Sequence, residues 1–259
     1  MPKKKRPVQL ELHMPTHGGA REGAGRPREG GRDRVPHEQR PQLRERTALH
    51  VTLRLHDGLP SLRQPSAWRV IVGVLRAVRA AAGFCVVQFS VQTNHLHFIV
   101  EADDAAALEH AMRSLCTRLA KRLHACFGRT GALLDDRHHA HVLSSPRETR
   151  AALAYVLLNA RKHAAECGRA FAPQWVDPYS SAPAFDGWAE SPRMMHEDVD
   201  CGTSPATTWL LTTGWRRHGP IAIDEVPGGR RSLRSATPSQ HPWPVIIDAW
   251  GIERARDAA

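Results

Sequence analysis

The sequence predicts an α+β fold, an antiparallel sheet of four strands backed by two helices, with a further helix after the last strand. Short segments of alternating apolar and polar residues are typical of half-buried strands. Longer segments with helical spacing of apolar residues lie between them. Over residues 48–169 the order is strand, helix, strand, strand, helix, strand, helix, and this order decides the fold class.

The first half of this order begins with an alternating strand at residues 49–55. Apolar residues then recur at helical spacing over residues 65–82. Two apolar strands, 84–91 and 95–100, flank Gln92-Thr93-Asn94, a polar interruption of hairpin length. These segments predict a strand, a helix and a hairpin.

The second half begins with a helix over residues 104–127, which Asp103 or Asp104 caps and which ends near Gly128. A short strand is predicted at residues 137–143. The next helix begins at Ser144 or Ser145, with Pro146 in its first turn and Glu148 completing a capping pattern; it contains Tyr155.

The order β-α-β-β-α-β is that of the ferredoxin-like arrangement, to which the sequence adds a C-terminal helix that carries the tyrosine. Such a fold does not by itself specify a function. Residues 1–47 precede this domain, which we expect to cover residues 48–169. Residues 170–259, rich in Trp and Pro, are predicted to form a smaller appended region.

The composition favours a partner that carries negative charge. Lys and Arg total 36 against 26 Asp and Glu, an excess that suits nucleic acid. The five cysteines form no Cys-x-x-Cys pair, which disfavours a structural zinc site and fits a reducing cytoplasm. No apolar run approaches the roughly 20 residues of a membrane span, so we expect a soluble cytoplasmic protein.

Residues 1–47 are expected to form a basic arm without regular structure, because they hold few apolar groups to bury. The tetrapeptide GRPR at 25–28 resembles the core of an AT-hook, whose arginines enter the minor groove of A/T-rich DNA. Arg26 and Arg28 are therefore candidate DNA-binding residues. Ala24 replaces the arginine that would precede this core, and a solvated linker is the alternative interpretation.

The first candidate site lies in the predicted strand that begins at His95. Because side chains alternate across a strand, His95 and His97 share a face about 7 Å apart, close enough for both imidazoles to bind one metal ion. His139 and His141 have the same spacing, and among 16 histidines about one such pair is expected by chance. Two polar residues on an exposed strand are the alternative.

The second candidate site is on the last predicted helix, where Tyr155 and Asn159 lie one turn apart and share a face. A phenol is a poor nucleophile near neutral pH, so a catalytic tyrosine needs a nearby cation. The amide oxygen of Asn159 is a candidate metal ligand. Half-buried packing is the alternative for Tyr155, and Tyr179 is the other tyrosine of the chain.

Four segments, in this order and spacing, resemble those of the REP-associated tyrosine transposases, a family of single-tyrosine HUH transposases. The histidine strand resembles the family's Asn-His-hydrophobic-His run, and the tyrosine helix follows about sixty residues later. The resemblance covers roughly residues 48–185. The matching segments are NHLHFIV, RHHAHVL, AYVLLNARKH and WVDPYSSA.

The resemblance implies that His95, His97 and Asn159 bind Mg²⁺ or Mn²⁺. It also implies that Tyr155 attacks a phosphodiester of hairpin-forming single-stranded DNA, forms a 5′-phosphotyrosine link and releases a 3′-hydroxyl that can later rejoin the strands. The protein would then act in the cytoplasm of a prokaryotic cell, at the nucleoid. The oligomeric state, for which a homodimer is one alternative, and the target sequence stay open.

Many members of the family have a proline after the metal-binding Asn, whereas Ala160 follows Asn159 here, so we expect the helix to be longer. The helix at 104–127 carries four cations that are candidate DNA-binding residues, with a solvated charged face as the alternative. These residues are Arg113, Arg118, Lys121 and Arg122.

Two other functions compete with a nicking and rejoining transposase. The first is a catalytically silent or domesticated DNA-binding protein on the same scaffold, which would have no reason to retain the histidine pair, Tyr155 and Asn159 together. The second is a plasmid relaxase or replication initiator. Relaxases usually place the tyrosine before the histidine strand, and the order here is the reverse.

Overall fold

The computed structural model describes residues 43, 45–192, 200–228, 246–247 and 253–254. Arg26 and Arg28 lie outside the described residues, as does nearly all of the expected basic arm. No helix in the described part of the chain is long and apolar enough to cross a membrane.

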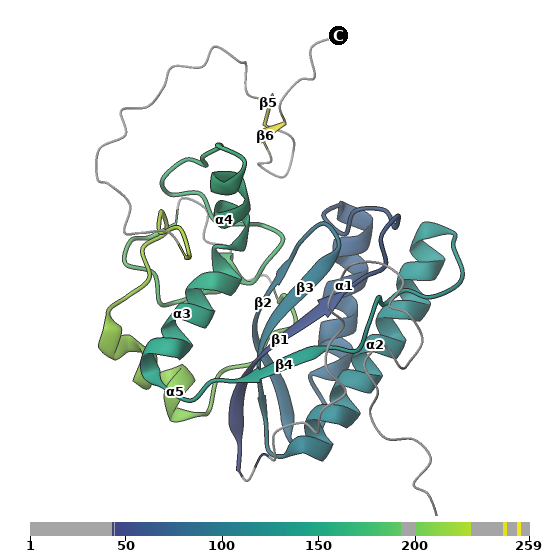
Figure 1. Ribbon diagram of the computed structural model, residues 1–259, viewed down its shortest axis with the longest axis horizontal. Coiled ribbons are helices and arrows are strands. Elements are labelled where there is room, and N and C mark those ends of the chain that lie inside the picture. Colours follow the sequence, from purple (N-terminus) through teal and green to yellow (C-terminus); the bar gives the residue numbers. More distant parts are fainter. Residues whose placement is uncertain (1–42, 44, 193–199, 229–245, 248–252, 255–259) are drawn as a thin grey trace, which may run out of the picture. The chain divides into compact units, whose positions relative to one another are not determined.

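Four strands form an antiparallel sheet in the order β2-β3-β1-β4, the order of a ferredoxin-like fold, and the predicted α+β class is confirmed (Figure 1). The strands are β1 (Thr47–Arg54), β2 (Phe84–Val91), β3 (His95–Ala102) and β4 (His139–Val142). The helices are α1 (Pro65–Val78), α2 (Ala105–Phe127), α3 (Pro146–Leu157), α4 (Asn159–Glu166), α5 (Trp209–Thr212), and the 3-10 helices η1 (Ala182–Ala184) and η2 (Gly214–His218). The strands β5 (Ile246–Ile247) and β6 (Glu253–Arg254) form a separate antiparallel pair.

Several expected boundaries differ from the structure by one to four residues, and two of the differences have a local cause. α1 ends at Val78, four residues early, because the chain turns there and reaches Gly83 at a φ of 68°, which favours glycine. The strand expected at 137–143 shortens to β4. At Arg137 the backbone N–H donates to the side chain of Asp136 instead of to a neighbouring strand.

One face of the sheet packs against α1 and α2. Alternate residues of β1, Leu49, Val51 and Leu53, are buried on this face together with Leu96 and Phe98 of β3. Figure 1 shows both helices on this side. This is the larger hydrophobic core, and it orients the remaining residues of β1 and β3 toward the opposite face.

The opposite face packs against α3. Ala48 of β1 and Ile99 of β3 are buried there with Val156 of α3 and with Trp215, which is 1% exposed. Trp215 comes from the part of the chain that was expected to form an appended region. The described residues between 176 and 223 thus contribute to a core that also holds the sheet and the tyrosine helix.

The segment that begins at Val176 is fixed to β2. Asp177, which is buried, accepts two hydrogen bonds of 2.7 and 2.8 Å from the guanidinium of Arg63. Ser181 accepts a hydrogen bond from the backbone N–H of Phe89 and donates to the Gln88 side chain. Such bonds hold this segment along the free edge of β2.

α3 begins as the sequence predicts. The Ser145 hydroxyl accepts a hydrogen bond from the backbone N–H of Glu148, and Pro146 occupies the first turn. The helix was expected to continue past Asn159, but it is interrupted at Leu158, with φ −108° and ψ 17°, and α4 starts at Asn159. The interruption places Tyr155 and Asn159 on two successive helices.

Glu101 anchors the chain after residue 200 to β3. Its carboxylate is fully buried and accepts hydrogen bonds from the backbone N–H and the hydroxyl groups of Thr207 and Thr208, as well as from Arg46. Burial alone would raise the pKa of Glu101, but these hydrogen bonds outweigh it and lower the pKa. The folded state therefore favours the ionised carboxylate.

Glu101→Gln is expected to lower the free energy of unfolding by roughly 2 kcal/mol at pH 7, because a neutral amide cannot accept all of these bonds. A lowered pKa stabilises the fold at pH values above the ordinary glutamate value near 4.5, and this contribution is lost as the pH falls below it. Urea unfolding from pH 7 to 3 should show wild type and variant converging in acid. The exposed Glu109→Gln is the control, and parallel curves for Glu101→Gln and wild type would contradict the assignment.

Candidate functional site

His95 and His97 lie together on the face of β3 that packs against α3. Their ring centroids are 4.8 Å apart in an edge-to-face arrangement. His97 is 4% exposed and His95 is half-buried. The alternation of β3 produces this pair, because Leu96 between the two histidines points into the other core.

The Nδ1 atom of each histidine has a neighbour that sets the orientation of the ring. The side-chain oxygen of Asn94 lies 3.0 Å from Nδ1 of His95. The Thr52 hydroxyl lies 3.1 Å and the His50 Nε2 atom 3.2 Å from Nδ1 of His97. In the described part of the chain, Nε2 of His97 is buried without a hydrogen-bond partner. A ring held at Nδ1 with a vacant Nε2 is suited to bind a metal ion.

The same surroundings keep the imidazoles of His50, His95 and His97 neutral. Burial lowers the pKa of His97 to about 2, with help from the neighbouring His95 and His50. Burial also lowers the pKa of His95 and of His50 to about 4 each. At neutral pH the lone pair of each ring is therefore free of a proton, which is the state that a metal ligand requires.

Of the two tyrosines, Tyr155 is the one beside this pair. Its ring centroid lies 5.2 Å from that of His97 and 5.7 Å from that of His50, edge-on to both. Tyr155 is half-buried. Tyr179 is 8% exposed and packs edge-on against Trp68 in the core under α1 and α2, on the other face of the sheet.

Asn159 is the first residue of α4 and is completely buried. Among the described residues, neither its amide oxygen nor its amide nitrogen has a hydrogen-bond partner. A buried polar group without a partner costs about 1–3 kcal/mol, so such a group calls for an explanation. The unpaired amide of Asn159 and the vacant Nε2 of His97 are both groups that a bound ligand would satisfy.

α4 contributes a lysine beside the tyrosine and a histidine beside His95. The ammonium of Lys162 lies 6.0 Å from the centre of the Tyr155 ring, and the ring of His163 lies 6.1 Å from that of His95. Glu166 pairs with both Lys162 and His163. Its hydrogen bond raises the pKa of Lys162, which therefore stays charged at neutral pH.

Arg161 fixes the position of α4. The residue is 7% exposed, and its guanidinium donates hydrogen bonds of 2.5 to 3.3 Å to four backbone carbonyls of the following loop. These carbonyls belong to Phe171, Ala172, Pro173 and Trp175. The loop is itself stiffened by Phe171 and Trp175, whose rings stack 3.7 Å apart.

Sequence analysis did not identify four residues of this site, namely His50, Thr52, Lys162 and His163. His50 and Thr52 alternate with apolar residues in the predicted first strand, so the sequence shows that both side chains lie on one face. Their contact with His97 could not be predicted, because it depends on the register of β1 against β3, which sets Thr52 opposite His97. Lys162 and His163 follow Asn159 directly, within one of the segments quoted above.

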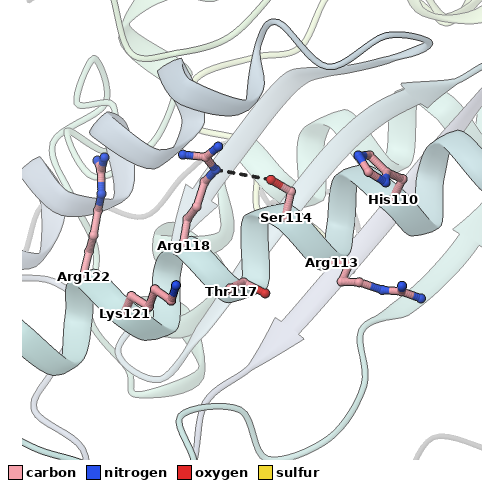
Figure 2. A pocket seen from close by; sticks show the side chains of 7 residues that line it. All are labelled: His110, Arg113, Ser114, Thr117, Arg118, Lys121 and Arg122. Atoms are coloured by element: carbon pink, nitrogen blue, oxygen red, sulfur yellow. Dashed lines mark hydrogen bonds between the residues drawn. The ribbon is translucent and has the colours of Figure 1, made fainter.

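The four cations that were predicted to bind DNA lie outside this site. They line the outer side of α2 (Figure 2), and α2 packs on the face of the sheet opposite to Tyr155. These residues are Arg113, Arg118, Lys121 and Arg122. His139 and His141, the second histidine pair, are exposed on β4, and His141 binds the Glu148 carboxylate. Within the described residues, no group of three or more His, Cys, Asp or Glu side chains is arranged to hold a metal ion.

No protein family and no curated protein matches the sequence. Among solved structures, the chain is similar to a REP-associated tyrosine transposase bound to a REP hairpin, with a TM-score of 0.46 and 16% identity over 77% of this chain and 99% of that one. It is also similar to a candidate transposase from Deinococcus radiodurans R1, with a TM-score of 0.34 and 16% identity over 56% of this chain and 100% of that one. TM-scores below 0.5 carry no conclusion about function, which rests on the site itself.

Asn159→Leu is expected to raise the free energy of unfolding of the metal-free protein by about 1–3 kcal/mol, because it removes a buried amide that has no partner. The same substitution should weaken the binding of Mn²⁺, since an oxygen ligand is lost. Urea unfolding and calorimetric titration with Mn²⁺ measure the two effects. His110→Ala, at an exposed histidine of α2 on the other face of the sheet, is the control. A variant that is less stable than wild type and binds Mn²⁺ unchanged would show that the amide is only structural.

Proposed function

We propose that the protein is a metal-dependent nuclease that cuts and rejoins single-stranded DNA through Tyr155, as a transposase does. The observation that carries this proposal is the position of the two tyrosines. Tyr155 packs edge-on against His97 and is partly accessible, whereas Tyr179 is buried in the opposite core. A protein that only bound DNA would gain nothing from the unpaired groups of His97 and Asn159.

The reaction is a transfer of a phosphoryl group to the phenol. The Tyr155 oxygen forms a bond to phosphorus while the bond from phosphorus to the 3′ oxygen breaks. The phenol loses its proton, and the leaving 3′ oxygen takes one up to become a hydroxyl. The product is a 5′-phosphotyrosine link that the 3′-hydroxyl can attack in reverse, so no external energy source is needed to rejoin the strands.

His95, His97 and Asn159 would hold the cation, Mg²⁺ or Mn²⁺, through two imidazole nitrogens and one amide oxygen. When bound, it supplies positive charge at the phosphate oxygens and beside the phenol. The residues around it set its surroundings. Asn94, His50 and Thr52 hold the two imidazoles at Nδ1.

Two further residues lie beside the tyrosine itself. Lys162 places a positive charge 6.0 Å from the centre of the Tyr155 ring, where it would attract the phosphate of an approaching strand. The edge contact with His50 limits the rotation of the Tyr155 ring. The packing of α3 on the sheet, with Val156 fully buried, keeps this tyrosine in reach of the histidines.

The substrate that we propose is a strand that forms a hairpin, on the strength of the four sequence segments quoted above. The cutting reaction at Tyr155 does not itself require a hairpin. The site requires a phosphodiester that can approach a half-buried tyrosine, which an unpaired strand can do more easily than a duplex.

Tyr155→Phe is expected to abolish the covalent adduct between the protein and a labelled, hairpin-bearing DNA strand in the presence of Mn²⁺. Phenylalanine keeps the packing of the ring and removes only the nucleophilic oxygen. Denaturing gel electrophoresis measures the adduct by its retarded migration. The matched control is Tyr179→Phe, which should form the adduct at close to the wild-type rate.

An adduct that persists in Tyr155→Phe and disappears in Tyr179→Phe would show that Tyr179, and not Tyr155, is the nucleophile. An adduct absent from wild type with Mg²⁺ and with Mn²⁺, over a set of hairpin sequences, would contradict the nuclease proposal and favour a DNA-binding protein on the same scaffold.

A further inference from the structure

The outer side of α2 carries a groove that the proposed chemistry does not use. Its lining residues recur every three to four positions, so they form one stripe along the helix. Four of them are cations, Arg113, Arg118, Lys121 and Arg122, and the others are one histidine and two hydroxyl-bearing residues. Figure 2 shows these side chains along the exposed side of α2.

Most of these cations have no carboxylate partner. Within the described residues, Arg118, Lys121 and Arg122 form no ion pair, and Arg118 bonds only to the Ser114 hydroxyl. Arg113 pairs with Glu109. Several arginines that serve the fold are neutralised by carboxylates: Arg46 pairs with Glu101, Arg63 with Asp177 and Arg150 with Glu225. The buried Arg161 donates to backbone carbonyls instead.

The α2 stripe differs from these arginines because its cations lie side by side in one groove, with no acidic residue among the lining. A row of unneutralised cations repels itself and lowers the stability of the helix that carries it. The same row is stabilised when an anionic partner binds. The groove contains no acidic residue among its lining, so nothing in it opposes such a partner.

We infer that this α2 groove binds the phosphate backbone of double-stranded nucleic acid, at a surface separate from the cutting site. The two surfaces lie on opposite faces of the sheet. The strand at Tyr155 and the nucleic acid on α2 are therefore different segments. The inference rests on the proposed function only in taking DNA as the partner.

The choice of duplex over single strand follows from the side chains. Sites for unpaired strands combine cations with aromatic rings on which bases stack. No Phe, Tyr or Trp lines the groove. From Arg113 to Arg122 the stripe spans roughly 13 Å at 1.5 Å per residue, which is close to the width of about 12 Å of a major groove of B-DNA. A helix lying across a major groove would therefore bring the stripe to the backbone phosphates on both of its sides.

The test uses the full chain without added metal and two fluorescent probes, a blunt 20-base-pair duplex and a 20-nucleotide thymidine strand. In the triple variant Arg118→Gln, Lys121→Gln, Arg122→Gln, duplex affinity should fall at least about tenfold, and the plot of log affinity against log salt should become shallower by about three. Binding of the thymidine strand should change much less.

A control variant that loses the same number of positive charges outside α2 separates the effect of the groove from the effect of net charge. The control variant Arg147→Gln, Arg169→Gln, Arg217→Gln removes three exposed arginines from α3 and the segments that follow it. It should leave the salt dependence of duplex binding close to that of wild type. The inference is overturned if the groove variant binds the duplex like wild type, or if the control variant loses as much affinity.

The variant Arg118→Lys, Arg122→Lys keeps the charge and should retain the salt dependence; its loss would show a structural role and overturn the inference. Adduct formation by the wild-type protein on the hairpin-bearing strand tests the proposed function separately. If that adduct forms and the groove variant still binds duplex normally, only this inference fails. If no adduct forms and the groove variant loses duplex binding, only the proposed function fails.

Discussion

The pairing of β1 with β3 is the constraint on which the site depends. Thr52 lies opposite His97 in this register, and His50 lies two residues away on the same face. A slip of one residue would exchange the two faces of a strand, so His97 would enter the core under α1 and α2. Leu96 and Phe98 prevent that slip, because both are fully buried in the larger core. Hydrophobic burial on one face thus positions the polar site on the other.

The second core brings the nucleophile to this surface. α3 packs on the sheet through residues such as Val156, and the chain after residue 200 packs around it and is anchored by Glu101. At the interruption after α3, Asn159 is left with a buried amide that has no partner. This unpaired amide lowers the stability of the fold, as is common for groups that a protein positions to bind a ligand. The cores on both faces compensate for that loss.

Much of the fold followed from the sequence, since the two- and 3.6-residue periods and the capping residues of α2 and α3 are local signals. The site was predictable in part. His95, His97 and Tyr155 were identified because strand alternation and a short motif suffice to group them. His50 and Thr52 were not linked to them, because strand register depends on long-range packing. The break at Leu158 and the packing of Trp215 were missed for the same reason, as both depend on contacts between distant segments.

One face of the sheet carries neutral imidazoles around Tyr155, and the helix α2 on the other face carries cations that mostly have no carboxylate partner. The central claim, that the imidazole face is a metal centre, is tested most directly by a crystal grown with Mn²⁺ and measured for anomalous scattering. We expect one anomalous peak within bonding distance of His95, His97 and Asn159. A peak at His139 and His141 instead, or no peak on this face of the sheet at saturating Mn²⁺, would contradict the account.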